Sequence, residues 1–116
     1  NITKIKIENE TLILPGNFKK RGDLIKVRVR ARDVLISKKK FNLNFIENIF
    51  SGNAVEIISE KDTAFAEVLI KIGKNKKYQF LRARITRYQL KKMNLKISDK
   101  IYVHIKAVSF DRQAII

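Results

Sequence analysis

The stretch LRARITRYQLKKMNLKISDKIYVHIKAVSF, residues 81–110, decides the fold because its apolar periodicity changes twice. Apolar residues alternate with basic ones up to Ile85, as in a strand with one buried face. Thr86 and Gln89 then have the spacing of a helix capping box, and Leu90 and Met93 follow near helical spacing. Alternation returns after residue 100. We therefore predict a strand, one short helix within residues 86–95, and a second strand over residues 101–110.

Alternation also governs most of the remaining chain. In KVRVRARD, residues 26–33, apolar residues alternate with four basic side chains, and we predict one long strand from Lys26 to Ile36. The turn signals are a Pro-Gly pair, a charged SEKD segment and a GKNKK segment. Further strands are predicted around residues 5–7, 12–14, 54–59, 64–72 and 78–85. These segments predict a largely β domain with short loops.

Length and composition set limits on the class of protein. With 116 residues and 45% hydrophobic content, the chain is long enough for one domain, or two very small ones, around a modest core. It lacks cysteine, which excludes disulfides and thiolate metal sites, and no apolar run approaches the ~18 residues of a membrane-spanning helix. The chain opens on Asn1, which favours a fragment or a processed product.

A net charge of +15 has two interpretations. It favours a polyanionic partner such as nucleic acid, an acidic membrane face or an acidic protein. It also fits a general compositional bias, because the excess is mostly lysine spread along the chain.

An internal similarity indicates a repeat. GDLIKVRVRARDV, residues 22–34, aligns without a gap with SDKIYVHIKAVSF, residues 98–110, and the alignment pairs Arg30 with Lys106. Both segments share an aspartate and an alanine at matching positions. The predicted organisation is a pseudo-repeat of two β units: the C-terminal part of a first unit over residues 1–40 and a complete second unit over residues 41–116.

The order of several motifs resembles one known family. LPG at residues 14–16, RARDVLIS at 30–37, IENIFSGNAVEI at 46–57 and the pattern ARIT…IKAVS at 83–109 together resemble the C-terminal domain of molybdate-importer ATPase subunits. That domain belongs to the MOP or TOBE class of small oligobinding-like (OB-like) β-barrels. The resemblance implies a mainly β, OB-fold-like barrel with one short helix. It also implies a homodimer, an ABC transporter complex at the inner face of the cell membrane, a cytoplasmic location, and a bound molybdate or tungstate as the only expected ligand.

The same resemblance supplies candidate oxyanion-binding residues. The family motif Ser-x-Arg-Asn matches residues 45–48, where Asn48 is retained, while Phe45 lacks the hydroxyl and Glu47 carries a negative charge in place of a positive one. Thr86 and Lys106 match positions that the family uses near the anion, and Arg30 is the repeat counterpart of Lys106. The expected site is therefore Asn48, Thr86, Lys106 and Arg30, with Thr86 also explained as a helix cap.

Catalysis is not predicted for this chain. It has no phosphate-binding G-x-x-x-x-G-K-[ST] loop, so any ATPase activity would belong to another part of a longer protein. The single His104 is expected at a surface or interface position, and no metal site is expected. Two other functions stay open: an OB-fold module that binds single-stranded nucleic acid, and a dimerisation module without a ligand. Nucleic acid is the weaker alternative, because Phe65, Phe80 and Phe110 are expected in the core rather than on a stacking surface.

Overall fold

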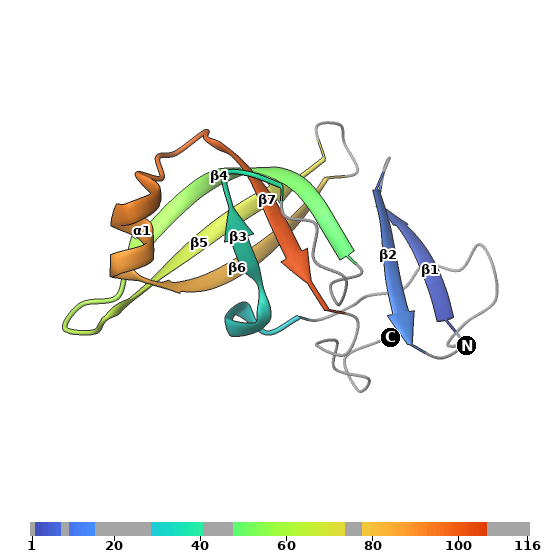
Figure 1. Cartoon of the computed structure of the whole chain (residues 1–116), viewed down its shortest axis with the longest axis horizontal. Helices are drawn as coiled ribbons and strands as arrows, with labels where there is room; N and C mark the ends of the chain where they lie inside the picture. Colours follow the sequence, from blue (N-terminus) through green and yellow to red (C-terminus); the bar gives the residue numbers. More distant parts are fainter. Residues whose placement is uncertain (1, 8–9, 16–28, 41–47, 74–77, 107–116) are drawn as a thin grey trace.

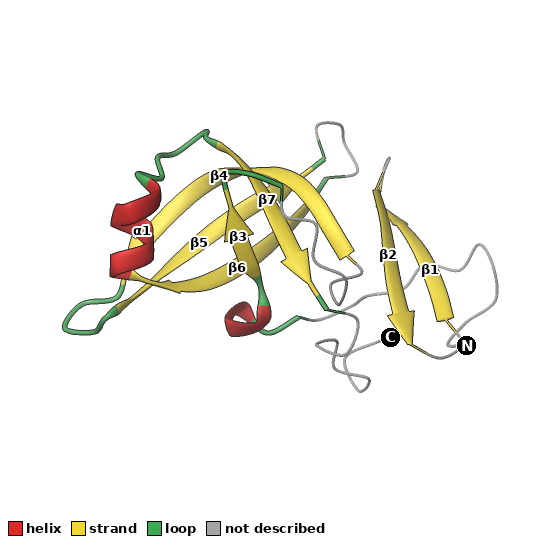
Figure 2. Ribbon diagram, in the orientation of Figure 1, coloured by secondary structure: helices red, strands yellow, loops and turns green. Residues whose placement is uncertain are grey.

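The computed structural model describes residues 2–7, 10–15, 29–40, 48–73 and 78–106. A short antiparallel hairpin of β1 (Ile2–Ile7) and β2 (Glu10–Pro15) forms one sheet (Figure 1). A second sheet has five antiparallel strands in the order β3-β7-β4-β5-β6, and Figure 2 shows it curling into a half-barrel. Its strands are β3 (Leu35–Ser37), β4 (Asn48–Ser59), β5 (Phe65–Ile72), β6 (Gln79–Thr86) and β7 (Lys100–Ile105).

The curl of the sheet depends on the long strand β4. The register of β4 against β5 shifts between Ala54 and Glu56, which inserts an extra residue and bends the strand. Gly52 lets β5 approach closely, since a Cβ atom there would lie 2.7 Å from the carbonyl oxygen of Lys71. One strand can therefore pair with β7 at its start and with β5 further along.

Alternate residues of the strands fill one continuous core. Ala66, Val68, Ile70 and Ile72 of β5 face inward, as the period of two requires. The other strands contribute inward residues in the same way, and the largest fully buried apolar side chains are those of Phe50, Ile70, Ile72, Ile101, Ile105, Val34, Val68 and Val103. The predicted mainly β, OB-like class is confirmed.

The long strand predicted from Lys26 to Ile36 is wrong. Residues 31–33 form the 3₁₀ helix η1 (Ala31–Asp33), and the strand that follows, β3, has only three residues. Asp33 donates its backbone N–H to the carbonyl of Arg30 over 2.9 Å, which closes the turn. The alternating pattern was misleading because Ala31 and Asp33 are small or polar enough for a turn. Residues 26–28 lie outside the described residues.

Two phenylalanines expected in the core are exposed instead. Phe65 is 37% exposed and Phe80 is 50% exposed, because they occupy the outward positions of β5 and β6. Apolar residues stand on both faces of β5, so the sequence alone did not identify the inner face. Phe110 lies outside the described residues.

The short helix is confirmed as α1 (Arg87–Met93). The Thr86 hydroxyl accepts a hydrogen bond from the backbone N–H of Gln89 over 3.0 Å, and Thr86 donates its own N–H to Gln89 Oε1 over 2.9 Å. This is the reciprocal capping box predicted from the spacing. Asn94 ends the helix in the left-handed conformation, with φ of 50°.

The structure hardly tests the predicted repeat. The alignment matches β7 with residues 24–29, and Val29 is the only one of these that the structure describes. The two-unit division therefore stays a prediction. Within the described residues, β3 pairs with β7, so a segment before residue 40 belongs to the five-stranded sheet.

Candidate functional site

Strand register brings two of the four candidate residues, Asn48 and Lys106, to one end of the five-stranded sheet, and a third, Arg30, precedes the short helix η1 that leads into β3 at that end. Asn48 begins β4 and lies opposite Ile105, the last residue of β7, and Lys106 follows directly. β3 begins beside the same end of β7, because Leu35 lies opposite His104. Figure 1 shows η1, which Arg30 precedes, just before that start of β3. We call this the β7 end of the sheet.

The three residues differ in their exposure. Asn48 is fully buried at the edge of the core, whereas Arg30 and Lys106 are exposed. A buried amide offers an N–H donor in a region of low dielectric, and exposed cations can approach an anion without losing much hydration. The combination of amide and cationic donors can satisfy the oxygen atoms of a small oxyanion.

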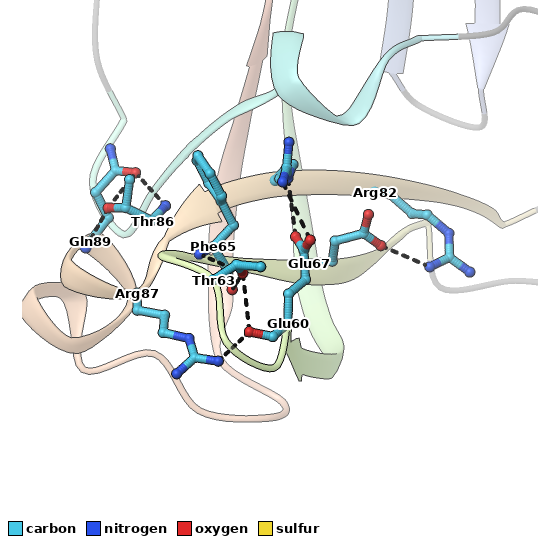
Figure 3. Close-up of polar contacts among 9 residues, drawn as sticks. Glu60, Thr63, Phe65, Glu67, Arg82, Thr86, Arg87 and Gln89 are labelled. Atoms are coloured by element: carbon cyan, nitrogen blue, oxygen red, sulfur yellow. Dashed lines mark hydrogen bonds and ion pairs between the residues drawn. The ribbon is translucent and has the colours of Figure 1, made fainter.

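Thr86 lies at the opposite end of the sheet. β5 and β4 run antiparallel, as do β6 and β5, so the end of β6 is far from the start of β4 along the strand direction. The Thr86 hydroxyl is engaged in capping α1 (Figure 3). Within one chain, Thr86 therefore does not join Asn48 and Lys106.

A buried polar pair next to the β7 end was not predicted from the sequence. His104 is only 2% exposed, and its Nε2 lies 2.9 Å from the Ser37 hydroxyl, so the surface position expected for it is wrong. Desolvation by burial lowers the pKa of His104 below its ordinary value of 6.5. The pair joins β3 to β7. The apolar residues on both sides of His104 in YVHIKA were a signal for burial.

A second polar contact holds the segment after β3. Lys38 Nζ lies 3.3 Å from Asp99 Oδ2 and donates to the carbonyl oxygen of Asn94 over 3.0 Å. The backbone N–H of Lys96 donates to the same carboxylate over 2.9 Å, and this bond, with Lys38, holds the pKa of Asp99 below its usual value. Asp99 therefore closes the turn that precedes β7.

Neither a metal-binding cluster nor a membrane-spanning helix occurs among the described residues. They contain no group of three or more His, Cys, Asp or Glu side chains suited to a metal ion. No helix among them combines the length and apolar character needed to cross a bilayer.

The fold defines the class of protein first. The chain superposes on a crystal structure described as the cytoplasmic molybdate-binding protein ModG with molybdate bound, with a TM-score of 0.64 over 75% of this chain and 59% of that one. Sequence identity in that comparison is 20%, so it establishes the fold alone. The chain is a small OB-like β domain. No family model matches it.

Sequence relatives then place the chain more narrowly. It is 31% identical over 106 residues to the molybdenum import ATP-binding protein ModC of Haemophilus ducreyi, covering 90% of this chain and 28% of that protein. The ModC protein of Photobacterium profundum is 29% identical over 77% of the chain, and that of Mesorhizobium japonicum is 31% identical over 78%. The chain is thus a homologue of the C-terminal region of ModC proteins, and it spans only about a quarter of the length of these relatives.

Proposed function

We propose that this chain is the oxyanion-sensing C-terminal domain of the ATP-binding subunit of a molybdate importer. The similarity to ModC proteins over 90% of the chain carries the proposal. The fold shared with a protein that was crystallised with molybdate supports it. In this role the domain would lie in the cytoplasm, attached to the membrane through the transporter complex.

The β7 end of the sheet is our proposed binding site for molybdate or tungstate. Asn48 would donate its amide N–H to an anion oxygen, while Lys106 and Arg30 would balance the negative charge. Because Asn48 is fully buried, its side chain can reach an anion only at the barrel end or after a small displacement there. Thr86 acts in this proposal as the cap of α1.

The proposed mechanism is thermodynamic linkage. An anion that binds one arrangement of two paired domains more tightly than another shifts the equilibrium toward that arrangement. The attached ATP-hydrolysing domains would then follow, so that a high internal oxyanion concentration changes transport. The domain itself needs no catalytic group for this role.

Isothermal titration calorimetry and thermal denaturation of the 116-residue chain with molybdate, tungstate, sulfate and a short oligonucleotide test the proposal. We expect molybdate and tungstate to bind and to raise the melting temperature, because a ligand of the folded state stabilises it by mass action. Sulfate serves as the control for charge alone. Binding of the oligonucleotide only, fading with added salt, would favour a nucleic-acid module. The absence of binding by every ligand would favour a ligand-free dimerisation module.

Glu47→Arg provides a sequence-based test of the motif alignment. The substitution restores the cation that the family motif has directly before Asn48, and we expect tighter molybdate binding because repulsion becomes attraction. Glu56→Arg makes the same charge change outside the motif, within β4, and is the matched control. Equal affinities for the Glu47→Arg variant and the wild type would show that the alignment is wrong.

A further inference from the structure

The positive charge of the chain is concentrated around α1. We call residues 38–40, 88–92 and 96–100 the α1 surface. These residues include seven lysines and one carboxylate, that of Asp99, so they contribute +6 of the net charge of +15. Figure 2 shows α1 across one end of the five-stranded sheet, away from the hairpin of β1 and β2. The α1 surface is therefore a strongly basic region at one extremity of the described structure.

A set of polar contacts holds the separate segments of the α1 surface together. Lys38 Nζ donates to the Asn94 carbonyl oxygen over 3.0 Å and lies 3.3 Å from Asp99 Oδ2. The same carboxylate accepts the backbone N–H of Lys96 over 2.9 Å. The end of β3, the end of α1 and the start of β7 therefore lie side by side, and their lysines form one surface.

Most lysines of the α1 surface carry a charge that no carboxylate balances. Asp99 is the only carboxylate of this surface, and it already pairs with Lys38. The other two ion pairs among the described residues belong to arginines of β6, Arg82 and Arg84. None of the other six lysines of the α1 surface forms an ion pair with a described residue. Uncompensated charges of one sign, gathered in one place, attract a polyanion more strongly than the same charges spread over the molecule.

Two large apolar side chains project between these lysines. Tyr88 is 72% exposed and Ile97 is 59% exposed, more than any other large hydrophobic side chain that the structure describes. Leu90 and Met93 pack against the core, which leaves Tyr88 on the outward side of α1. The Nζ atom of Lys92 lies 5.8 Å from the centre of the Tyr88 ring, so a ring and an ammonium group share this side. An apolar ring with a polar hydroxyl is suited to the boundary between water and lipid.

We propose that the α1 surface binds the anionic headgroup layer of a lipid bilayer. All seven cations are lysines, whose flexible stems and point-like charges need no fixed arrangement of partners. A fluid layer of anionic headgroups offers no fixed arrangement, and clusters of roughly four to eight basic residues are typical of such contacts. Tyr88 and Ile97 then enter the layer between the headgroups. The inference goes beyond the proposed function, because the oxyanion site is proposed at the opposite end of the sheet.

Other polyanions fit the α1 surface less well. Lysine is depleted at protein–protein interfaces, which argues against an acidic protein. Nucleic acid is bound through aromatic stacking and through the bidentate fork of arginine. Tyr88 is the only aromatic residue of this surface, and none of its cations is an arginine. The composition of the α1 surface therefore favours lipid headgroups.

Vesicle sedimentation with the whole chain tests the contact. We expect wild type to sediment with phosphatidylcholine vesicles that contain phosphatidylserine, less so at high salt, and not with vesicles of phosphatidylcholine alone. Lys91→Gln/Lys92→Gln should weaken this binding roughly tenfold or more. Arg32→Gln/Arg82→Gln removes the same charge from exposed positions elsewhere and, as the matched control, should have little effect. Equal losses in the two variants, or no sedimentation of wild type, would overturn the proposal.

Competition separates lipid from other polyanions. A short oligonucleotide or polyglutamate, at an equal concentration of negative charge, should displace little of the chain from the phosphatidylserine vesicles. Displacement of most of the chain by either competitor would assign the α1 surface to nucleic acid or to an acidic protein, against a lipid contact.

A tryptophan reporter tests whether the apolar side chains enter the headgroup layer, since the native chain has no tryptophan. In the Tyr88→Trp variant we expect a blue shift of the fluorescence when phosphatidylserine vesicles are added. Phe80→Trp places the same reporter at an exposed position on β6 and should show no shift. An unshifted Tyr88→Trp variant, or equal shifts in both variants, would contradict contact through the α1 surface.

Discussion

The two ends of the five-stranded sheet have different chemical characters. At the β7 end, the buried Asn48 lies opposite the last residue of β7, which the exposed Lys106 follows, and the exposed Arg30 precedes η1, which leads into β3. At the α1 end, the Thr86 hydroxyl and the Gln89 amide satisfy each other across the first turn of the helix. Both ends match the same family pattern in sequence. Only the β7 end brings several candidate donors together.

This contrast shows that strand direction decides which residues of a sequence motif can lie in one binding site. Residues that a motif groups together can be separated by the full length of a strand when they lie at opposite ends of antiparallel partners. We expect substitutions at the β7 end to change oxyanion binding and substitutions at the α1 end to change stability. The strand β4 connects the two ends, so a change within it should have the largest effect.

Gly52→Ala should have the largest effect. A Cβ atom at this position would lie 2.7 Å from the Lys71 carbonyl oxygen and 2.9 Å from Ile70 Cγ2, so β4 and β5 would have to separate. We expect a loss of about 1–3 kcal/mol in the free energy of unfolding, measured by urea denaturation. Glu56→Ala, exposed on the same strand, should change it by less than about 0.5 kcal/mol. Similar losses in both variants would mean that the close approach does not limit the fold.

Lys106→Glu tests the β7 end directly. Reversing this charge should weaken molybdate binding roughly tenfold, or about 1.4 kcal/mol, in a calorimetric titration. The stability should change little, because Lys106 is exposed. Lys100→Glu makes the same charge change at the other end of β7 and should leave the affinity nearly unchanged. An equal loss in both variants would indicate a general charge effect and no site at the β7 end.

Thr86→Ala tests the α1 end. Removing the cap should lower the free energy of unfolding by about 1 kcal/mol, because the Gln89 N–H loses its acceptor. Thr86→Ser keeps the oxygen and should restore most of the stability. Calorimetry should find unchanged molybdate affinity in both variants. A selective loss of affinity in the alanine variant would place Thr86 in the binding site, against the separation of the two ends.

The smallest expected effect concerns pH and the buried pair beside β7. Burial lowers the pKa of folded His104, so the unfolded chain takes up a proton at a higher pH than the folded chain. The contribution of neutral His104 to the free energy of unfolding is fully present above the ordinary pKa of 6.5. It is lost as the pH falls below 6.5 toward the lower pKa of His104 in the folded chain. Denaturation at about pH 7.5 and 5.5 should show lower stability at the acid value. His104→Gln should reduce the difference, and an unchanged difference would assign it to other groups.

Much of the β architecture could be predicted from the sequence because periodicity is a local signal. The capping box of α1 depends on residues three apart, and β5 and β6 are found within one or two residues of their predicted bounds. The 3₁₀ turn at Ala31 was missed because alternation continues through it. The exposure of Phe65 was missed because apolar residues on both faces of β5 hide which face meets the core.

The candidate site was harder to predict, because it depends on distant pairing. Nothing near Ser37 in the sequence indicates that its hydroxyl lies 2.9 Å from a ring nitrogen 67 residues further along. The grouping of Asn48 with Lys106 likewise follows from the register of β4 with β7. The separation of Thr86 from them required the complete strand order.

The position of β3 has a consequence for biosynthesis. Strands β4, β5 and β6 pair with their neighbours in sequence, and each pair can form soon after it leaves the ribosome. β3 is made before them, yet its partner β7 is the last strand of the sheet in the chain. Until β7 emerges, the backbone groups of β3 have no partner in this sheet, and the nascent chain exposes an unpaired strand edge. The slowest step in folding this domain should therefore be this last, long-range closure.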